Sequence, residues 1–542
     1  CWATRLKVHF RLPLAPPDVF LYSLQMIRYA LPLLAACLLV SDLFAQQPEF
    51  DAFEHTIPEL QSAMERGETT SLELVQRYLD RIDAFDRQGP QLYTMLYLNP
   101  RALEEAKALD RERTGRGSRG PLHGIPVVLK DNYDTFDMPT TAGAIALAGF
   151  VPSDDAYQVR KLREAGAVFI GKSNLHEFAR GIETVSSLGG YTLNPYDPRR
   201  NPGGSSGGTA AAVAANFAAA GMGSDTCGSI RIPAANNNLF GIRVTQGLSS
   251  RDGIIPLSHT QDVGGPIARS VVDLATILDV TVGADAADPQ TSGAAGHIPD
   301  TSRSFLKADA LEGARLGLLT GFVRKDSPYG EVSRVFQRAV DFMGDNGATV
   351  IEVHPDGLDD LLNNSSVIDL EFKFDLEKYL RQSDAPVKTL SEILESGQYH
   401  RALEKRYRRS DAAEPNSDKY QARLKNRTKL AQMLIESMTA NHLDAMVYPT
   451  IRVKPTFVGE GQFGSVCWIA AHSGFPAITV PAGFTEDGLP VGLELLAKPF
   501  GEGRLIELAY AYEQIAKPRR PPPRTPSLVS DVLSYRFELR SQ

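Results

Sequence analysis

The sequence is poor in cysteine and tryptophan and has no long run of basic residues. Its 542 residues include 4 cysteines and 2 tryptophans, which is too few cysteines for a disulfide framework. Lysine and arginine together number 57 against 65 aspartates and glutamates, so the formal charge is -8. Outside the short stretch 405–409, no basic cluster of the kind that binds nucleic acid occurs. We therefore expect small molecules or peptides as partners, and no nucleic acid.

Long hydrophobic runs are also missing. One apolar run, residues 30–40, is shorter than the roughly 20 residues that a membrane-spanning helix needs, and no comparable run follows it. We therefore expect no membrane span in the mature protein. A content of 43% hydrophobic and 23% charged residues is typical of a globular protein and excludes a disordered or collagen-like chain.

The N-terminal residues predict export. Met26-Ile-Arg-Tyr begins a short basic segment, which the apolar run and the small residue Ala45 follow. This order is typical of a secretory signal peptide, here residues 26–45, and it makes residues 1–25 an upstream extension that reflects the choice of start site. The expected location is periplasmic or secreted. Lipid attachment at Cys37 is the weaker alternative, because apolar residues continue beyond it.

Two cysteines remain after such a cleavage, Cys227 and Cys467. An export compartment permits a disulfide between them. Cys227 lies in a glycine-rich segment, and buried free cysteine is a common state in proteins. We expect two buried free thiols, with a single disulfide as the alternative.

Short apolar runs that alternate with helical segments indicate the fold class. Runs of this kind are typical of strands buried on both faces of a largely parallel sheet, and they predict an α/β fold. Capping boxes that begin at Thr56 and Thr70 predict two amphipathic helices near the start. The predicted strands are 125–129, 167–170, 316–319, 349–353, 445–448, 477–480 and 491–495.

Two motif matches carry no function. Residues 166–173 satisfy the P-loop pattern, but the four intervening residues are apolar and predict a strand rather than a phosphate-binding loop. Residues 304–307 match the Ser-x-x-Lys pattern of penicillin-binding enzymes, yet the partner motifs of that class are absent from the sequence. Neither segment is therefore a candidate site.

A glycine- and serine-rich segment, 203–208, precedes an alanine-rich helix predicted over 209–220. Residues 203–207 fit the Gly-x-Ser-x-Gly pattern of the α/β-hydrolase nucleophile elbow. An esterase of that class also needs a downstream histidine, and three are available by chain order: His259, His442 and His472. A flexible linker is the non-functional alternative, but linkers are not normally joined directly to a strong helix-forming run.

A second segment of this kind, 223–233, follows about twenty residues later. Small residues ahead of a serine allow backbone N–H groups to converge as in an oxyanion hole. No histidine lies nearby, so a serine nucleophile here would need a neutral lysine as its base. Lys130 ends an apolar strand, where ligands meet parallel sheets, and it qualifies. The alternative for Lys130 is an exposed surface lysine.

Taken together, these segments resemble the amidase signature family. The matching stretches are 121–131, 171–178, 203–210, 223–233 and 474–483, and the resemblance extends over about residues 50–515. It implies the amidase-signature fold, an α/β/α sandwich around a large mixed, mostly parallel sheet. It also implies a single amidase domain over 46–525, with a helical insertion around 360–440 and a C-terminal tail over 526–542.

The resemblance assigns roles to particular residues. Ser229 would be the nucleophile, Ser205 the bridging serine and Lys130 the base, with a cis peptide bond between Gly204 and Ser205. Cys227 stands where the family usually has glycine, and residues 233–245 also depart from the family pattern. The oxyanion would be held by the backbone N–H groups of Thr226, Cys227, Gly228 and Ser229. The side chains that would support the two loops are those of Ser206, Asp225 and Arg231.

The function implied is an exported amidase. It would hydrolyse the C–N bond of a linear carboxamide, such as a peptide amide, to a carboxylate and ammonia or an amine through an acyl-Ser229 intermediate. No metal or organic cofactor is expected, because no His, Cys and carboxylate cluster has ligand spacing in the sequence. The protein would act as a monomer or homodimer. The alternatives are an amidotransferase A-type subunit that makes ammonia from glutamine for a partner and, more distantly, an α/β-hydrolase esterase.

Overall fold

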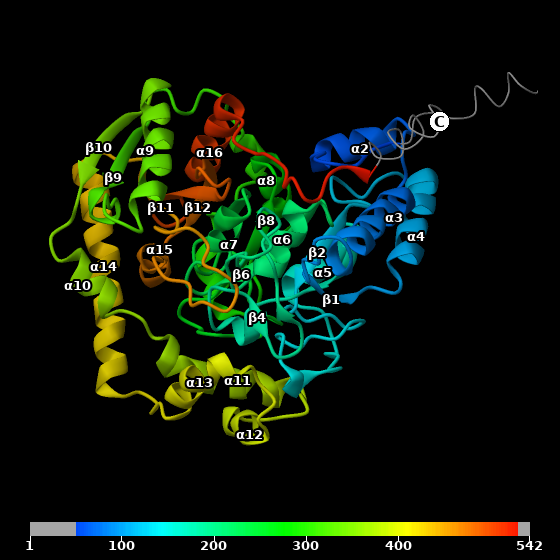
Figure 1. Cartoon of the computed structure of the whole chain (residues 1–542), viewed down its shortest axis with the longest axis horizontal. Coiled ribbons are helices and arrows are strands. Elements are labelled where there is room, and N and C mark those ends of the chain that lie inside the picture. The colour runs from blue at the N-terminus through cyan, green and yellow to red at the C-terminus, as the bar shows by residue number, and fades with distance from the viewer. Residues whose placement is uncertain (1–49, 529–542) are drawn as a thin grey trace, which may run out of the picture. The chain divides into compact units, whose positions relative to one another are not determined.

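The computed structural model describes residues 50–528, of which Ala52–Leu528 form one unit (Figure 1). The predicted extension 1–25, the predicted signal peptide 26–45 with Cys37, and residues 529–542 of the predicted tail lie outside the described residues. Within residues 50–528, no helix is both long and apolar enough to cross a membrane.

Two capped helices begin the unit, as the sequence predicts. Helix α2 (Ile57–Glu65) and helix α3 (Ser71–Ile82) each start at a threonine whose hydroxyl accepts the N–H of a glutamate three residues later. That glutamate's carboxylate accepts the threonine N–H in return, which satisfies two backbone donors at each helix start. Helix α4 (Ala102–Arg116) packs against α3.

Eleven strands form the central sheet, in the order β1-β3-β2-β6-β8-β7-β12-β13-β11-β9-β10. All seven strands that the sequence predicts are present in it. The strand bounds are β1 (Met95–Leu98), β2 (Pro126–Lys130), β3 (Val168–Ser173), β6 (Ala220–Asp225), β7 (Phe240–Arg243), β8 (Val263–Ala268), β9 (Arg315–Leu319), β10 (Thr349–Val353), β11 (Ala445–Pro449), β12 (Ala477–Phe484) and β13 (Pro490–Leu496). A separate hairpin consists of β4 (Val185–Ser186) and β5 (Gly190–Tyr191).

The sheet is mixed, but it is not mostly parallel as the sequence predicts. Strand β2 runs parallel to β3 and β6, and β9 runs parallel to β10 and β11. The other neighbouring pairs, which include the whole stretch from β6 to β11, are antiparallel. Apolar runs indicate only that a strand is buried on both faces of the sheet. Antiparallel strands that are buried on both faces have the same pattern, so the runs do not distinguish the two directions.

Helices cover both faces of the sheet. A Cβ atom on Gly265 of β8 would meet Ile230, next to helix α7 (Arg231–Asn236), whereas one on the adjacent Gly264 would meet Gln158 of helix α5 (Tyr157–Glu164). Because successive strand residues point to opposite faces, α7 and α5 lie on different sides of the sheet. Helix α6 (Gly207–Ala214) packs against α7, and helix α8 (Val271–Thr281) packs against α5.

The alanine-rich helix is shorter than predicted. It ends at Ala214, and residues 220–225 form strand β6 rather than the last turn and a loop. A Cβ atom on Gly221 of this strand would lie 2.4 Å from Thr209 and 3.2 Å from Val213, both in α6. The glycine therefore allows helix and strand to approach closely, and it gives this central strand the composition of a loop.

Helices fill the long connection between β10 and β11, which contains the segment around 360–440. Phe372 and Tyr407 of this segment form an aromatic cluster with Phe178, which lies outside it, so the helices pack against the rest of the unit. The helices are α10 (Leu358–Asn363), α11 (Ile368–Gln382), α12 (Leu390–Ser396), α13 (Glu404–Asp411) and α14 (Asp418–Ala440).

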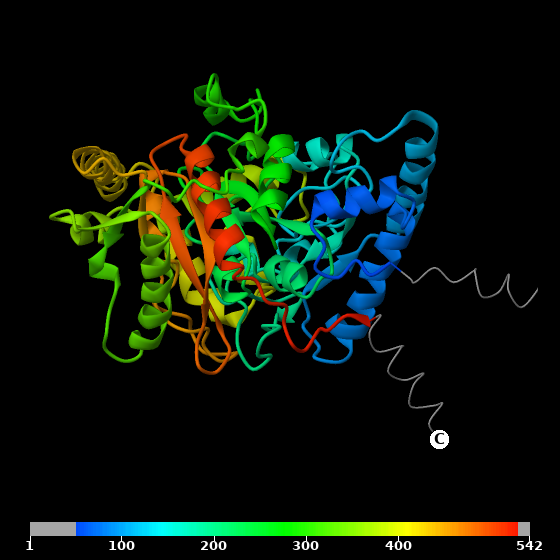
Figure 2. The same cartoon turned by 90° about the horizontal axis from the view of Figure 1, so that it is seen from above.

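The C-terminal part of the sheet is covered by two further helices. Helix α9 (Gly330–Asp345) and helix α16 (Glu502–Ala516) both pack on β12, and Figure 2 shows the red α16 beside the orange strands. Helix α15 (Trp468–Ser473) precedes β12 and packs against α14.

Candidate active site

Three segments converge at one edge of the sheet. Lys130 is the last residue of β2, Ser205 lies just before α6, and Ser229 lies between β6 and α7. Strands β2 and β6 are adjacent and parallel, so their carboxyl ends point to the same edge. The predicted site residues are therefore brought together by neighbouring elements of a single unit.

Lys130 is fully buried, which rules out the alternative of an exposed surface lysine. Its Nζ atom donates to Ser205 Oγ at 2.7 Å and to Ser224 Oγ at 2.8 Å. Burial lowers the pKa of Lys130 to about 7, and the more distant carboxylates of Asp225 and Asp262 only partly oppose that shift. Near neutral pH a large fraction of the amine is therefore uncharged and able to accept a proton.

Ser205 follows a cis peptide bond, as the family resemblance implies. Its Oγ atom accepts from Lys130, and its carbonyl oxygen accepts the N–H of His176 at 2.9 Å. A Cβ atom on Gly204 would lie 2.8 Å from the carbonyl carbon of Ile182, so only glycine fits before the serine. The segment that follows Gly181 therefore covers this peptide bond closely.

Ser229 is 3% exposed and lies next to the Ser205 segment. The N–H of Ser206 donates to the Ser229 carbonyl oxygen at 3.2 Å, which ties the two serine loops together. No hydrogen-bond partner of Ser229 Oγ is present among residues 50–528. The hydroxyl is thus unengaged and available for another group.

The loop before Ser229 presents three free backbone donors rather than four. The Gly228 N–H, which the resemblance assigns to the oxyanion hole, donates to Asp225 Oδ1 at 2.8 Å. In the described part of the chain, no acceptor lies on the N–H groups of Thr226, Cys227 and Ser229. The Gly228 amide instead fixes the loop, because a charged acceptor makes a strong hydrogen bond.

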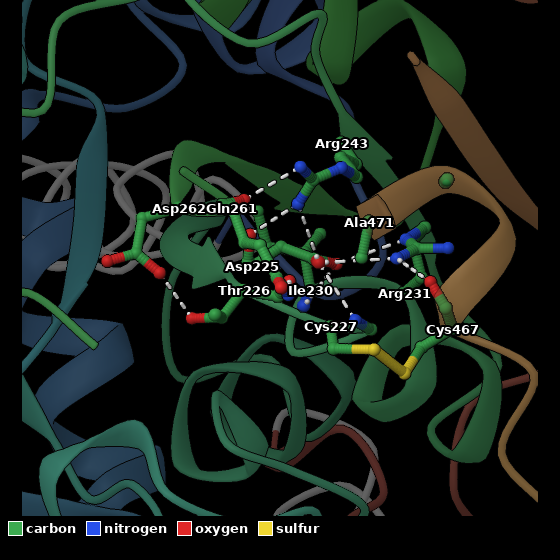
Figure 3. A network of polar contacts seen from close by, with 12 residues as sticks. Asp225, Thr226, Cys227, Ile230, Arg231, Arg243, Gln261, Asp262, Cys467 and Ala471 are labelled. Carbon is green, nitrogen blue, oxygen red and sulfur yellow. Dashed lines mark hydrogen bonds and ion pairs between the residues drawn. A yellow bond between two sulfur atoms is a disulfide. The ribbon is translucent and has the colours of Figure 1, made fainter. Parts of the chain in front are cut away.

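Asp225 and Arg231 hold the loop through a buried ion network (Figure 3). Asp225 pairs with Arg231 at 3.0 Å and with Arg243 at 3.1 Å. Arg231 also pairs with the buried carboxylate of Glu494. Burial alone would raise the pKa of Asp225, but the two guanidinium groups hold it well below its usual range. Asp225 is therefore a fixed anion that accepts backbone N–H groups of the loop.

The Amidase family model matches residues 73–506 of this chain. The chain belongs to the Amidase family. A protein of Arabidopsis thaliana named as a probable amidase is 35% identical over 495 residues, which cover 87% of this chain and 92% of that protein. The A-type subunit of the glutamyl-tRNA(Gln) amidotransferase of Syntrophus aciditrophicus is 35% identical over 492 residues, or 87% of this chain and 99% of that protein.

Solved structures agree with this assignment. The native peptide amidase from Stenotrophomonas maltophilia superposes with a TM-score of 0.80 at 39% identity, covering 87% of this chain and 98% of that one. An amidase family protein from Bacillus anthracis superposes with a TM-score of 0.78 at 34% identity, covering 87% of this chain and 92% of that protein. The protein is an amidase, a hydrolase that acts on C–N bonds in amides.

The amidase site also contains residues that sequence reasoning missed. Ser224 Oγ accepts from both Lys130 and Asn132 Nδ2, so it orients the lysine. Asp262 Oδ1 accepts the Thr226 hydroxyl at 2.5 Å and thereby anchors the start of the loop. Ser224 was hidden because residues 220–225 have the composition of a glycine-rich loop, and Asp262 directly precedes β8, far away in the sequence. Recognition of β6 as a strand beside β2 would have indicated Ser224.

The expectation of two free cysteines is wrong. Cys227 of the loop and Cys467, just before α15, form a disulfide across 240 residues of sequence (Figure 3). A sequence pattern does not report which loop meets which helix start, and this pairing depends on the position of α15 beside the loop.

Among residues 50–528, none of the three histidines that an esterase reading offers is placed to act as a base for these serines. His259 Nδ1 lies 2.9 Å from Asp375 Oδ1, and His472 is buried beside helix α14. Within residues 50–528, neither of these histidines nor His442 makes a hydrogen bond to Ser205 or Ser229. The rejected P-loop match is strand β3, as predicted.

One cluster has the composition of a metal site. His259, Glu371 and Asp375 have ligand atoms within 4.8 Å of one another. Internal contacts account for the arrangement, since Asp375 pairs with His259 and Glu371 accepts from Ser258, Thr260 and Tyr420. His259 and Asp375 also line a cavity of about 860 Å³, together with Asp262. None of the three predicted catalytic residues lines it.

Proposed function

We propose that this amidase is an exported enzyme that hydrolyses a linear carboxamide, such as a peptide amide, through an acyl-enzyme on Ser229. The observation that carries the proposal is the contact between Lys130 and Ser205. A buried amine with a pKa of about 7 lies 2.7 Å from the hydroxyl of a serine whose segment is tied to the loop of Ser229. These are a base, a relay and a nucleophile without any histidine.

The reaction follows from this order of groups. Neutral Lys130 accepts the proton of Ser205, Ser205 accepts that of Ser229, and Ser229 Oγ attacks the amide carbonyl carbon. The developing oxyanion is held by the free N–H groups of Thr226, Cys227 and Ser229. Ser205 then protonates the departing nitrogen, which leaves as ammonia or an amine. Water, deprotonated through the same relay, hydrolyses the acyl-Ser229 ester to the carboxylate.

Two observations support the substrate class and the location. The likeness to the peptide amidase covers nearly all of that enzyme, which supports a peptide amide as substrate. The disulfide between Cys227 and Cys467 supports export, because such bonds persist mainly in oxidising compartments. The signal peptide predicted over 26–45 agrees with it.

Ammonia release from an N-acylated dipeptide amide tests the activity. The purified protein alone is expected to form ammonia and the free acid in equal amounts, whereas the Ser229→Ala protein forms neither. A denaturing gel of cell fractions, with N-terminal sequencing of the product, tests export and should find a chain that begins near Gln46 outside the cytoplasm. If the protein releases ammonia from none of the amides in a broad panel, the proposal is wrong.

A second candidate is an amidotransferase A-type subunit. The 35% identity with the protein from Syntrophus aciditrophicus favours it, and that identity covers 99% of that protein. A subunit of this kind would release ammonia from glutamine, and efficiently only with a partner. Comparing glutamine with the dipeptide amide in the same assay separates the two, because a preference for glutamine would favour the amidotransferase role.

A further inference from the structure

The disulfide lies inside the catalytic machinery rather than at the surface of the fold. Cys227 is one of the three loop residues with a free N–H, and it is partly exposed at the site. Cys467 is 5% exposed and directly precedes helix α15. We propose that the Cys227–Cys467 disulfide is a positioning element that holds the oxyanion loop in its catalytic conformation, so that turnover depends on the closed bond. This inference rests on the proposed function of the loop.

Hydrogen bonds hold the loop on both sides of Cys227 but not at it. Thr226 is anchored through its hydroxyl to Asp262 and through its carbonyl oxygen to Gln261 Nε2. Gly228 is anchored through its N–H to Asp225. Among residues 50–528, no hydrogen bond reaches the Cys227 backbone. The disulfide is therefore what restrains this residue between two fixed neighbours.

The other end of the bond belongs to a packed part of the fold. Arg231, itself held by Asp225, donates to the Cys467 carbonyl oxygen at 3.5 Å. A Cβ atom on Gly228 would lie 2.9 Å from Cys467 Cβ, so loop and helix start are already in contact. Cys467 also packs with Ile232 and Ile451 in a small apolar cluster. The bond thus joins the loop to a rigid support (Figure 3).

A fixed loop matters more for the transition state than for substrate binding. Backbone donors stabilise an oxyanion only when they are already oriented toward it, and a displacement of about 1 Å can cost about 100-fold in rate. The ground-state amide depends far less on these donors. Opening the bond should therefore lower kcat and leave KM nearly unchanged.

Reduction of the folded protein provides the test. Dithiothreitol opens the S–S bond by thiol–disulfide exchange, delivers two electrons and two protons, and closes to its own cyclic disulfide. Thiol titration under native conditions should then find two additional thiols per chain. We expect kcat on the dipeptide amide to fall about 10- to 100-fold with KM within about threefold, and reoxidation to restore it.

Variants and a second readout make the test specific. The Cys227→Ala/Cys467→Ala protein should start at the reduced rate and be insensitive to dithiothreitol. The midpoint of its pH profile should stay near 7, because Lys130 is untouched. Hydrogen exchange of the loop 226–230 should be faster in the reduced protein, whereas exchange of β9 should not change. If the double variant does not fold, the kcat and KM of the reduced wild-type protein still test the positioning role of the disulfide.

Distinct outcomes contradict this inference and the proposed function. A protein with both thiols counted that keeps its kcat within twofold, or that changes only in KM, overturns the positioning role. Oxidised protein that is inactive on every amide overturns the proposed function instead. In that case hydrogen exchange of the loop 226–230, compared between oxidised and reduced protein, tests whether the disulfide orders the loop. If the exchange rates do not change, the disulfide does not position the loop.

Discussion

Two buried lysines at the ends of neighbouring strands have opposite environments. Lys130 ends β2, and Lys172 lies near the end of the adjacent strand β3, where it pairs in register with Leu129. Both side chains are fully buried. Lys172 Nζ lies 3.4 Å from Asp131, whereas Lys130 contacts only hydroxyl and carbonyl oxygens and no carboxylate within 4 Å among the described residues.

Burial is common to both lysines, so the difference between them lies in the groups that surround each amine. Burial lowers the pKa of both amines. For Lys172 the adjacent Asp131 opposes that shift, and the contact between the two side chains at 3.4 Å joins β3 to the segment after β2. For Lys130 the pKa reaches about 7, which is the range that a base needs at neutral pH. The first lysine therefore suits catalysis and the second suits structure.

The largest effect is expected at the group that Lys130 serves. In the proposed mechanism Ser229 forms the acyl-enzyme, so turnover of Ser229→Ala should fall by about 100,000-fold or more. Ammonia release measures it, and thermal unfolding of the same sample should match the wild type. If this variant retains turnover, another group is the nucleophile. The difference between Lys130 and Lys172 would then say nothing about catalysis.

Exchanging each lysine for methionine breaks the comparison directly. Lys130→Met should lower kcat about 1,000- to 10,000-fold with no loss of stability, because it removes a buried amine that has no ionic partner. Lys172→Met should instead leave Asp131 buried without its cation, and we expect unfolding to become easier by about 3 to 5 kcal/mol. Urea unfolding and kcat of the folded fraction measure both. Equal effects of the two variants on kcat would contradict the assignment.

Removing the relay should be less damaging than removing the base. Ser205→Ala leaves neutral Lys130 in place, and a water in the space of the hydroxyl can transfer the proton. We expect a loss of about 100- to 1,000-fold in kcat, measured with the same amide. A variant of full activity would show that Lys130 does not act through this 2.7 Å contact.

The pH profile tests the charge of Lys130. The amine must be neutral to act, so kcat/KM should rise about tenfold per pH unit below a midpoint near 7 and level off above it. Lys172→Met should keep this midpoint, which serves as the matched control. A profile that is still rising at pH 10 would mean that Lys130 has an ordinary lysine pKa.

The smallest effect is expected at Ser224, the second hydroxyl that Lys130 contacts. Ser224 Oγ accepts from Lys130 at 2.8 Å, and such a bond stabilises the charged amine more than the neutral one. Ser224→Ala should therefore move the midpoint of the pH profile downward and lower kcat by about fivefold through looser positioning. A midpoint that rises instead would contradict the role of this hydroxyl.

Much of this protein follows from local patterns in its sequence. Short apolar runs indicated seven strands. The spacing of threonine and glutamate in the capping boxes indicated α2 and α3, and the glycine- and serine-rich segments indicated both serine loops. These signals are local, because each depends on residues a few positions apart. Lys130 was also found this way, since it ends an apolar strand.

The remaining features depend on tertiary contacts. Strand β6 looks like a loop in the sequence because helix α6 packs closely against Gly221, and in β8 the glycines 264 and 265 leave room for Gln158 of α5 and for Ile230. The Ser224 contact, the use of the Gly228 N–H by Asp225 and the bond from Cys227 to Cys467 all depend on which segments meet across the sheet. The charge state of Lys130 has the same origin, because it is set by groups that the fold, and not the neighbouring sequence, places around the amine.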